Sequence, residues 1–452
     1  MAEAGPRRHP VDEVLPVPKL ALYGFQHVLA FYAGAVIVPI LVAGQIGLSD
    51  EQLVYLINAD LFTCGIASII QALGFWRVGV RLPIVQGVTF TAVAPMIAIG
   101  QGAENATAGL LAIYGATITA GIVTLIAAPF LGRLLRFFPP LVTGTVLTIM
   151  GLILLPNALK DAAGGAGAED FGSWKHLLYA GGTLLFILAV YRMHRPFLSS
   201  IAVLLGLVGG TVVSWALGDT TFDQVGQADW FGVTTPFHYG TPTFHIGAIV
   251  AMLLVMMVTV VETVGDSKAT GEIVGKEVGD EDITRALRAD GVSTFLGGVL
   301  NAFPYTCFAQ NVGLVRLTGV RSRFVVVAAG VIMMVLGLFP KAAGYVASIP
   351  PDVLGGAAVA MFGMVGVVGI QTLSKVDLRQ ERNALVVAVS IALALLPAAA
   401  PEVFEQMPRD VSAILNSGIT LGAISAIVLN LVFNVFARTS PPEDDAEKAP
   451  AG

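Results

Sequence analysis

Charged side chains are scarce in this chain. Asp, Glu, Lys and Arg make up only 12% of its 452 residues, whereas a soluble globular protein carries about 25%. Hydrophobic residues reach 55%, and the mean hydropathy is +0.79. This composition excludes a chain built from several soluble domains, and it predicts a membrane protein with many apolar spans.

Cysteine and the common catalytic motifs are also scarce. Cys64 and Cys307 lie in apolar stretches, so the sequence contains neither a disulfide framework nor a CxxC metal site. It lacks HExxH, GxSxG and the dinucleotide fingerprint, and Gly271–Lys276 resembles a phosphate loop that is one residue short. The basic residues lie in loops rather than on a nucleic-acid-binding face. We therefore predict that the protein is not an enzyme and has no cofactor, metal or nucleic-acid partner.

Long apolar runs predict about fourteen membrane-spanning helices. Numbering the loops between them places 20 of the 25 Lys and Arg residues on one side and 4 on the other, with Arg316 inside a short span. Cytoplasmic loops are the ones that collect Lys and Arg. The pattern therefore predicts a multi-pass protein of the cell inner membrane with both termini in the cytoplasm. The polar N-terminus lacks the apolar core of a signal peptide, so the first span is expected to remain.

Two polar, broken segments lie at similar places in the two halves of the chain. Arg81–Phe90 and Phe303–Gly313 each contain a proline, then a glutamine, then a glycine, at the start of a short apolar run. They open the third and tenth predicted spans, so an odd number of spans separates them and the halves would be inverted. Paired broken segments in inverted repeats indicate a transporter's substrate site near the membrane midplane. Chance is the alternative, since Gly and Pro are common in membrane helices.

Two carboxylates lie in or near an otherwise apolar span. Glu262 follows the unbroken apolar run Ala248–Val261, and Asp266 lies one helical turn further on. Ionisable groups inside a span are costly and are candidates for function. Glu262 would accept hydrogen bonds from ring N–H groups of a ligand, with a structural ion pair as the alternative. Asp266 is either a proton site coupled to Glu262 or a solvated helix end.

Other polar residues in the spans are weaker candidates. Gln310 and Asn311 carry amides suited to the edge of a nucleobase, although Asn311 is also a candidate helix cap. His27 lies inside the first span, where a satisfied packing group is the simpler interpretation. Asp290 is expected to pair with a neighbouring cation in the simpler interpretation. Asn416 is a candidate for lining a gate or for forming a hydrogen bond between helices.

Several ordered motifs resemble one known family. Gln310–Gly319 matches every defined position of the signature of the nucleobase–ascorbate transporter family, also called the second nucleobase–cation symporter family. Further similarity lies in Gln26-His27, Gln86–Phe90, Glu262–Asp266 and Arg288–Gly291, and it resembles the bacterial urate and xanthine permease branch. The resemblance runs from about residue 15 to residue 438.

The resemblance implies an all-α membrane fold of fourteen segments in two inverted seven-helix repeats, with short broken segments at spans 3 and 10. It implies a homodimer joined through its gate domains and an elevator-like movement of the core. The implied boundaries are a cytoplasmic N-terminal tail (1–18), a core domain (19–138 and 245–346), a gate domain (139–218 and 347–438), an extracellular loop (219–244) and a disordered cytoplasmic tail (439–452).

The resemblance also implies roles for individual residues. Glu262 and Gln310 would hold a purine base through its polar edge, while Phe90 would pack against the ring. The full set of expected substrate-binding residues is Glu262, Gln310, Phe90, Thr89, Gln86 and Asn311. The residues expected to couple protons or to be critical for transport are Asp266, Asp290 and His27.

Substrate selectivity rests on two positions. Gln310 follows the purine pattern, whereas uracil-type members have Glu there, and Thr89 resembles urate-preferring members rather than xanthine-preferring ones with Asn. A threonine leaves room for the additional C8 oxygen of urate. We therefore expect proton-coupled import of urate, with xanthine next and sodium coupling less favoured. The alternatives are another nucleobase such as uracil, an inorganic anion carried by the same fold, or a membrane enzyme or receptor.

Overall fold

The protein is predominantly helical. The computed structural model describes residues 9–134, 139–165, 167–222, 225–226, 228–404, 407, 415 and 417–436. Within these residues, nine helices are long and apolar enough to cross a membrane. The number rises to ten when α13 (Phe324–Leu336) and α14 (Pro340–Ala347), which are bent by 83° relative to each other, are counted as one span.

The elements follow one another as helices interrupted by two very short strands. The first half contains η1 (Pro10–Asp12), α1 (Val17–Ile46), α2 (Asp50–Leu73), β1 (Gln86–Val88), η2 (Phe90–Ala92), α3 (Val93–Gln101), α4 (Ala106–Leu134), α5 (Pro140–Ala162), α6 (Trp174–Arg192), α7 (Pro196–Ser200) and α8 (Ala202–Ala216). The second half contains α10 (Ile246–Val274), α11 (Asp280–Val299), β2 (Tyr305–Cys307), α12 (Ala309–Thr318), α13, α14, α15 (Pro351–Leu373), α16 (Glu381–Ala399), η4 (Pro401–Phe404), α18 (Gly418–Asn430) and η5 (Leu431–Phe436).

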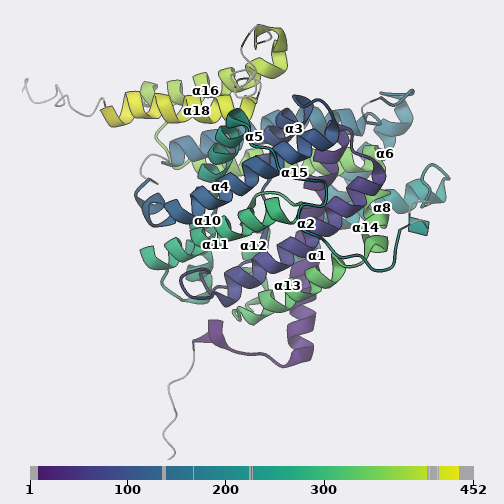
Figure 1. The fold of residues 1–452 in the computed structure, drawn as a ribbon, viewed down its shortest axis with the longest axis horizontal. Helices are drawn as coiled ribbons and strands as arrows, with labels where there is room; N and C mark the ends of the chain where they lie inside the picture. Colours follow the sequence, from purple (N-terminus) through teal and green to yellow (C-terminus); the bar gives the residue numbers. More distant parts are fainter. Residues whose placement is uncertain are drawn as a thin grey trace, which may run out of the picture.

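The helices pack in two groups that each draw on both halves of the chain. In the first group α4 packs on α11 and α10, and α13 packs on α2 and α1. In the second, α5, α6 and α8 pack on α15, and α16 packs on α18. Figure 1 shows α16 and α18 together at one edge of the molecule and α1 and α13 toward the opposite edge. The substrate-site candidates of the sequence lie mainly in the first group.

Small residues allow the helices of the second group to approach closely. A Cβ added at Gly144 of α5 would lie 2.9 Å from the carbonyl oxygen of Gly369 in α15, and one at Gly151 would lie 2.8 Å from the carbonyl oxygen of Phe362. Membrane helices associate through such small-residue interfaces because lipid gives no hydrophobic force between them. The sequence therefore favours tight backbone contact between α5 and α15.

The two broken segments occur where the sequence places them, and they meet. β1 pairs with β2 in an antiparallel ladder with Gln86 opposite Cys307 and Val88 opposite Tyr305. The backbone N–H of Thr89 donates to Pro304 (2.9 Å), which extends the ladder by one residue. Extended backbone at membrane depth is tolerated where it is enclosed by protein, and all six strand residues are buried.

The difference between nine or ten apolar helices and the predicted fourteen has a physical source. α3 has 9 residues, α12 has 10 and α8 has 15, all shorter than a simple span requires. α11 begins with Asp280, Glu281 and Asp282, so its first turn is strongly charged. The predicted tail at 439–452 lies outside the described residues.

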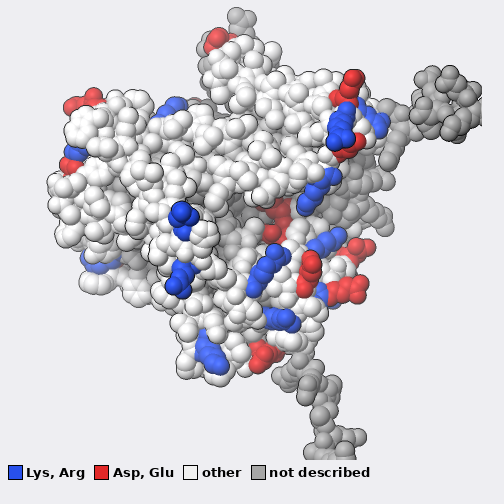
Figure 2. Space-filling view, turned by 180° about the vertical axis from the view of Figure 1, so that it is seen from behind, with Lys and Arg blue, Asp and Glu red and all other residues white. Residues whose placement is uncertain are grey.

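The surface matches a membrane environment. Figure 2 shows a face with few charged side chains over most of its area, and Lys and Arg gathered mainly toward its lower right. Many large apolar side chains of the second helix group are exposed, including Leu185 (67% exposed) and Val212 (51%). Such exposure in water would be unusual for a soluble monomer, whereas lipid tails accommodate it.

A polar cluster lies at the start of α6. Lys175 pairs with Asp219 at 2.5 Å, and this hydrogen bond lowers the pKa of Asp219. His176 contacts Asp352 (2.8 Å) and Asp170 (2.9 Å), and the His176 hydrogen bond lowers the pKa of Asp170. The cluster ties α6 to α15 and to the loops that precede α6 and follow α8.

The predicted extracellular loop 219–244 is anchored to the first helix group. The Thr235 backbone N–H donates to the Tyr55 hydroxyl (2.9 Å), and the Asn301 side chain donates to the Thr235 carbonyl (2.7 Å). The ring of His238 stacks on Tyr55 with centroids 3.8 Å apart. These contacts hold the loop over the ends of α2 and α11.

Candidate functional site

The Glu262 carboxylate joins α10 to both broken segments. Its Oε1 accepts a hydrogen bond from Thr91 of η2 (3.4 Å), and its Oε2 accepts one from Thr306 of β2 (3.2 Å). Glu262 is partly exposed, while both threonines are buried. No cation of the described chain lies within ion-pair distance of Glu262, so the alternative of a structural ion pair is not supported. The carboxylate is held by two hydroxyl groups and remains open to a further donor.

Gln310 lies in the first turn of α12, directly after β2. Its side chain is exposed, and the part of the chain that the structure describes gives it no side-chain hydrogen-bond partner. The first turn of a helix also presents backbone N–H groups that lack partners within the helix. A free amide on a half-helix that follows the Glu262-linked strand is suited to binding a planar polar ligand.

An aromatic wall surrounds Phe90. Its ring lies 6.2 Å from Phe308 and 6.3 Å from Phe362 of α15, the latter in an edge-to-face arrangement. Phe308 in turn contacts Phe31 of α1, with ring centroids 4.8 Å apart. Phe90 is only partly buried, whereas the other three rings are buried. Phe90 therefore offers a ring face where the two helix groups meet.

The Gln86 side chain binds two protein partners. Its amide N–H donates to the carboxylate of Asp290 on α11, and its Oε1 accepts from Ser293 (2.7 Å). Gln86, Asp290 and Ser293 are each 0% exposed. Among the described residues Asp290 has no cation partner, so the expectation that it pairs with a neighbouring cation is wrong: an amide on β1 occupies that place. The arrangement fixes β1 against α11.

Asn311 binds α1. Its side-chain amide donates to His27 Nδ1 (3.0 Å) and to the His27 carbonyl (3.1 Å). Asn311 is the third residue of α12, and the residue at the N-cap position is Phe308, which makes no side-chain capping bond. The prediction that Asn311 caps this helix is therefore wrong. His27 is 2% exposed, consistent with a satisfied packing group. The Asn311 Oδ1 atom is buried and has no hydrogen-bond partner in the part of the chain that the structure describes.

Two of the remaining candidates, Thr89 and Asp266, lie in described parts of the chain. Thr89 is 1% exposed, and its hydroxyl accepts from the backbone N–H of Thr91 (3.2 Å), so it caps η2. Asp266 lies one turn beyond Glu262 on α10 and is partly exposed. Asn416 lies outside the described residues.

Sequence reasoning missed three residues of the site. Thr91 and Thr306 hold Glu262, and the buried Asp60 carboxylate accepts from the hydroxyl of Tyr305 in β2 (3.0 Å). Thr91 and Thr306 lie within or next to the broken segments, which was the available signal. Asp60 lies in an apolar span and could have been identified as an intramembrane carboxylate.

Solved transporter structures share this fold. The transmembrane domain of the cyanobacterial bicarbonate transporter BicA matches with a TM-score of 0.58 at 15% identity, covering 92% of this chain and 98% of that one. Murine Slc26a9, an anion transporter in the inward-facing state, matches with a TM-score of 0.63 at 13% identity, covering 95% of this chain and 70% of that one. Both matches show that this chain shares the fold of these two structures.

Sequence comparison identifies the family. The sequence profile of a family described as a permease family matches residues 18–403 of this chain. The chain is 43% identical to the xanthine permease of Bacillus subtilis (strain 168) over 94% of its length and 96% of that protein. It is 44% identical to the uric acid transporter UacT of Escherichia coli (strain K12), covering 94% and 88%, and 44% identical to the uric acid permease PucK of B. subtilis, covering 92% and 95%. The chain belongs to this permease family, the nucleobase–ascorbate transporters, as its motifs indicate.

Proposed function

We propose that this protein imports a purine base by proton symport, with urate as the preferred substrate and xanthine next. The observation that carries the proposal is the Glu262 carboxylate, which is held by hydroxyls of both broken segments and is partly exposed, while the Gln310 amide is exposed on the short helix that follows β2. The names of the related permeases support the same class of substrate.

The chemistry of a purine matches these groups. Ring N–H groups donate to the Glu262 carboxylate, and the Gln310 amide supplies both a donor and an acceptor for the oxygen and nitrogen atoms of the polar edge. Phe90 packs against the ring face. Thr89 is smaller than the Asn of xanthine-preferring members and leaves room at β1 for the C8 oxygen of urate, although a methyl-sized change gives modest discrimination.

Proton coupling is assigned to the carboxylates of α10. Glu262 and Asp266 lie one turn apart on the same helix face, so protonation of one changes the field at the other. A protonation change tied to purine binding would allow the inward proton gradient to drive accumulation. Asp290 and His27 contribute by fixing β1 and α12 in place.

The transport movement is assigned to the two helix groups. In this proposal the first group is the core domain (19–138 and 245–346) and the second is the gate domain (139–218 and 347–438), in a fourteen-segment inverted repeat. The core moves against a gate that dimerises with a second copy, in the cell inner membrane with both termini cytoplasmic. The packing of α4 on α11 and of α5 on α15 supports this division.

The test is uptake of labelled urate in cells that lack their own purine permeases. We expect uptake that a protonophore abolishes and that unlabelled xanthine blocks, while uracil and sulfate leave it unchanged. Cells carrying an empty vector give the background. Uptake of xanthine or uracil without urate would contradict the substrate assignment, and protonophore-resistant accumulation would contradict the coupling.

A further inference from the structure

We propose a second binding site, for a phosphate-bearing ligand, in a cavity at the end of α10 away from Glu262. The cavity has a volume of about 500 Å³, and four of its lining residues are the cations Arg81, Lys276, Arg285 and Arg323. Val274, the last residue of α10, lies twelve positions after Glu262, which is about 18 Å along the helix axis. The cavity at this end of α10 is therefore separate from the candidate purine site.

Protein carboxylates balance only part of the positive charge that lines this cavity. Arg323 pairs with Asp12 (2.7 Å), and Arg285 pairs with Glu281 (2.7 Å). Arg81 and Lys276 form no ion pair with any described residue, although Glu272 and Glu277 lie near Lys276 around a neighbouring depression. The Nε of Arg285 is also buried, and no described residue is its hydrogen-bond partner. Like charges gathered around one space repel, and a bound anion relieves the repulsion.

Arg81 is held at the cavity by its backbone. It adopts φ 58°, a left-handed conformation that is uncommon for a residue with a side chain. Its N–H donates to the Gln71 carbonyl (3.1 Å), and its side chain lies over Gly74, where an added Cβ would be 2.8 Å from the Arg81 Cγ. Strained backbone of this kind is retained where the surrounding structure imposes it, often at binding sites.

The N-terminal segment forms one wall of the cavity. Val11 is 1% exposed and packs with Val80, Leu82 and Val274. The backbone N–H of Arg323 donates to the Val11 carbonyl (3.0 Å), and the His9 ring lies 3.2 Å from the Gly275 carbonyl. The wall is therefore joined to α10 and α13.

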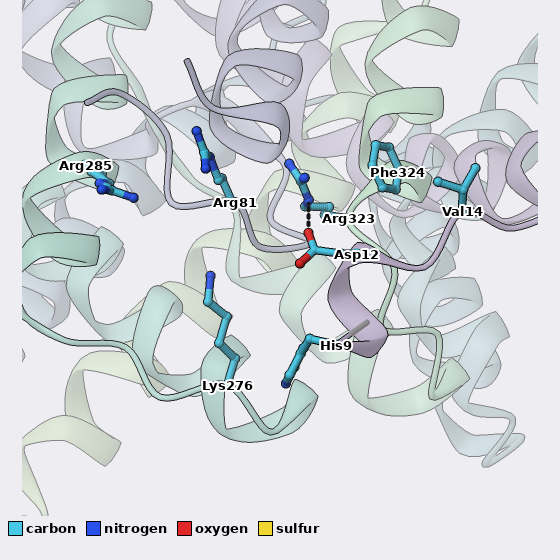
Figure 3. Close-up of a pocket in the computed structure, with 8 residues that line it drawn as sticks. All are labelled: His9, Asp12, Val14, Arg81, Lys276, Arg285, Arg323 and Phe324. Carbon is cyan, nitrogen blue, oxygen red and sulfur yellow. Dashed lines mark hydrogen bonds and ion pairs between the residues drawn. The ribbon is translucent and has the colours of Figure 1, made fainter. Parts of the chain in front are cut away.

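The donor set selects the ligand class. Arginine presents a planar fork that matches phosphate oxygens, and lysine adds a point charge. Figure 3 shows the Lys276 side chain extending into the space bordered by Arg81, Arg285 and the Asp12–Arg323 pair. The volume exceeds that of one phosphate, so the site accommodates either a soluble polyphosphate or the headgroup of an anionic phospholipid.

The test measures binding of two probes to the full-length purified protein. Inorganic pyrophosphate is titrated by calorimetry, and thermal midpoints are compared in phosphatidylcholine nanodiscs with and without phosphatidylglycerol. The variant is Arg81→Gln/Lys276→Gln, and the matched control is Lys375→Gln/Arg379→Gln, which removes the same charge from exposed positions after α15. We expect the variant to weaken binding by about tenfold or more and the control to leave it unchanged.

Each outcome has one meaning. Pyrophosphate binding that depends on Arg81 and Lys276 supports a soluble phosphate ligand. Stabilisation by phosphatidylglycerol alone, with the same dependence, supports a lipid headgroup. If neither probe depends on these two residues, the proposal is overturned. If the variant misfolds, the rate of chemical acetylation of Lys276 in the unmodified protein is measured instead. Binding of a probe at the site must slow acetylation of Lys276 without slowing acetylation of Lys375.

Discussion

Replacing Glu262 with Gln tests the centre of the candidate site. The two side chains have nearly the same shape, and the glutamine amide still offers one acceptor and a donor to the hydroxyls of Thr91 and Thr306, which lie 3.4 and 3.2 Å from the carboxylate oxygens. Because a hydroxyl both donates and accepts, both contacts persist after it rotates. We therefore expect the free energy of unfolding to change by less than about 1 kcal/mol.

The effect on transport is expected to be much larger. A hydrogen bond to a charged acceptor contributes about 1.5–3 kcal/mol. The glutamine amide is neutral and keeps only one acceptor oxygen, so the purine would lose one such bond and the other would be weakened. A loss of about 3 kcal/mol corresponds to an affinity roughly 150-fold weaker. Glu262→Gln also removes a titrating group of α10. Initial rates of protonophore-sensitive urate uptake, normalised to the amount of protein in the membrane, measure the combined effect.

Glu272→Gln is the matched control. Glu272 is an exposed carboxylate on the same helix, and in the described chain its side chain has no hydrogen-bond partner. We expect this variant to transport urate at the unmodified rate. If Glu262→Gln keeps protonophore-sensitive uptake within about twofold of the unmodified protein, the assignment of Glu262 as the purine acceptor is refuted.

Three further changes test the surroundings of the site. In Gly87→Ala the added Cβ would overlap the buried ring of Phe31 and lie 2.9 Å from a ring carbon of Phe308. We expect about 1–3 kcal/mol of overpacking and a loss of uptake, and normal uptake would show that β1 is free to move. Asn311→Ala removes both donors to His27; we expect about 1–3 kcal/mol less stability in thermal unfolding, and an unchanged midpoint would contradict the structural role. The hydrogen bond from Lys175 lowers the pKa of the Asp219 carboxyl below its ordinary value of 3.8. A carboxyl whose pKa is lowered in the native state stabilises the protein above its unfolded pKa, and this stabilisation is lost as the pH falls through the native pKa. The melting midpoints of the unmodified protein and Asp219→Asn should therefore differ at neutral pH and converge below pH 3.8, whereas a pH-independent difference would contradict the ion pair.

Local properties of the sequence predicted the broken segments. Proline and glycine interrupt the apolar run at Arg81–Phe90 and at Phe303–Gly313, and the structure has β1 and β2 within these ranges. The depth of Glu262 in an apolar helix identified it as a candidate without knowledge of its neighbours. These features depend on hydropathy and chain stiffness, which are encoded over a few residues.

The hydrogen-bond partners of buried polar side chains could not be predicted from such local properties. The amide of Gln86 was expected at a ligand, and the contacts of its side chain with Asp290 and Ser293 could not be predicted. That outcome depends on how α11 lies against β1, more than 200 residues away in the chain. A glutamine that binds a substrate and one that fixes a strand look the same in sequence, because both are polar groups in an apolar setting. Only the three-dimensional arrangement distinguishes them.

The ladder between β1 and β2 has a mechanical consequence. Each strand leads into a short helix, so the ladder is a crosslink between two segments that belong to different halves of the chain. Its backbone hydrogen bonds, together with the Glu262 contacts on either side, resist separation of the two segments. A displacement of one segment therefore drags the other with it. Any motion that exposes the site alternately to the two membrane surfaces has to carry both segments as one rigid unit, without opening a gap between them.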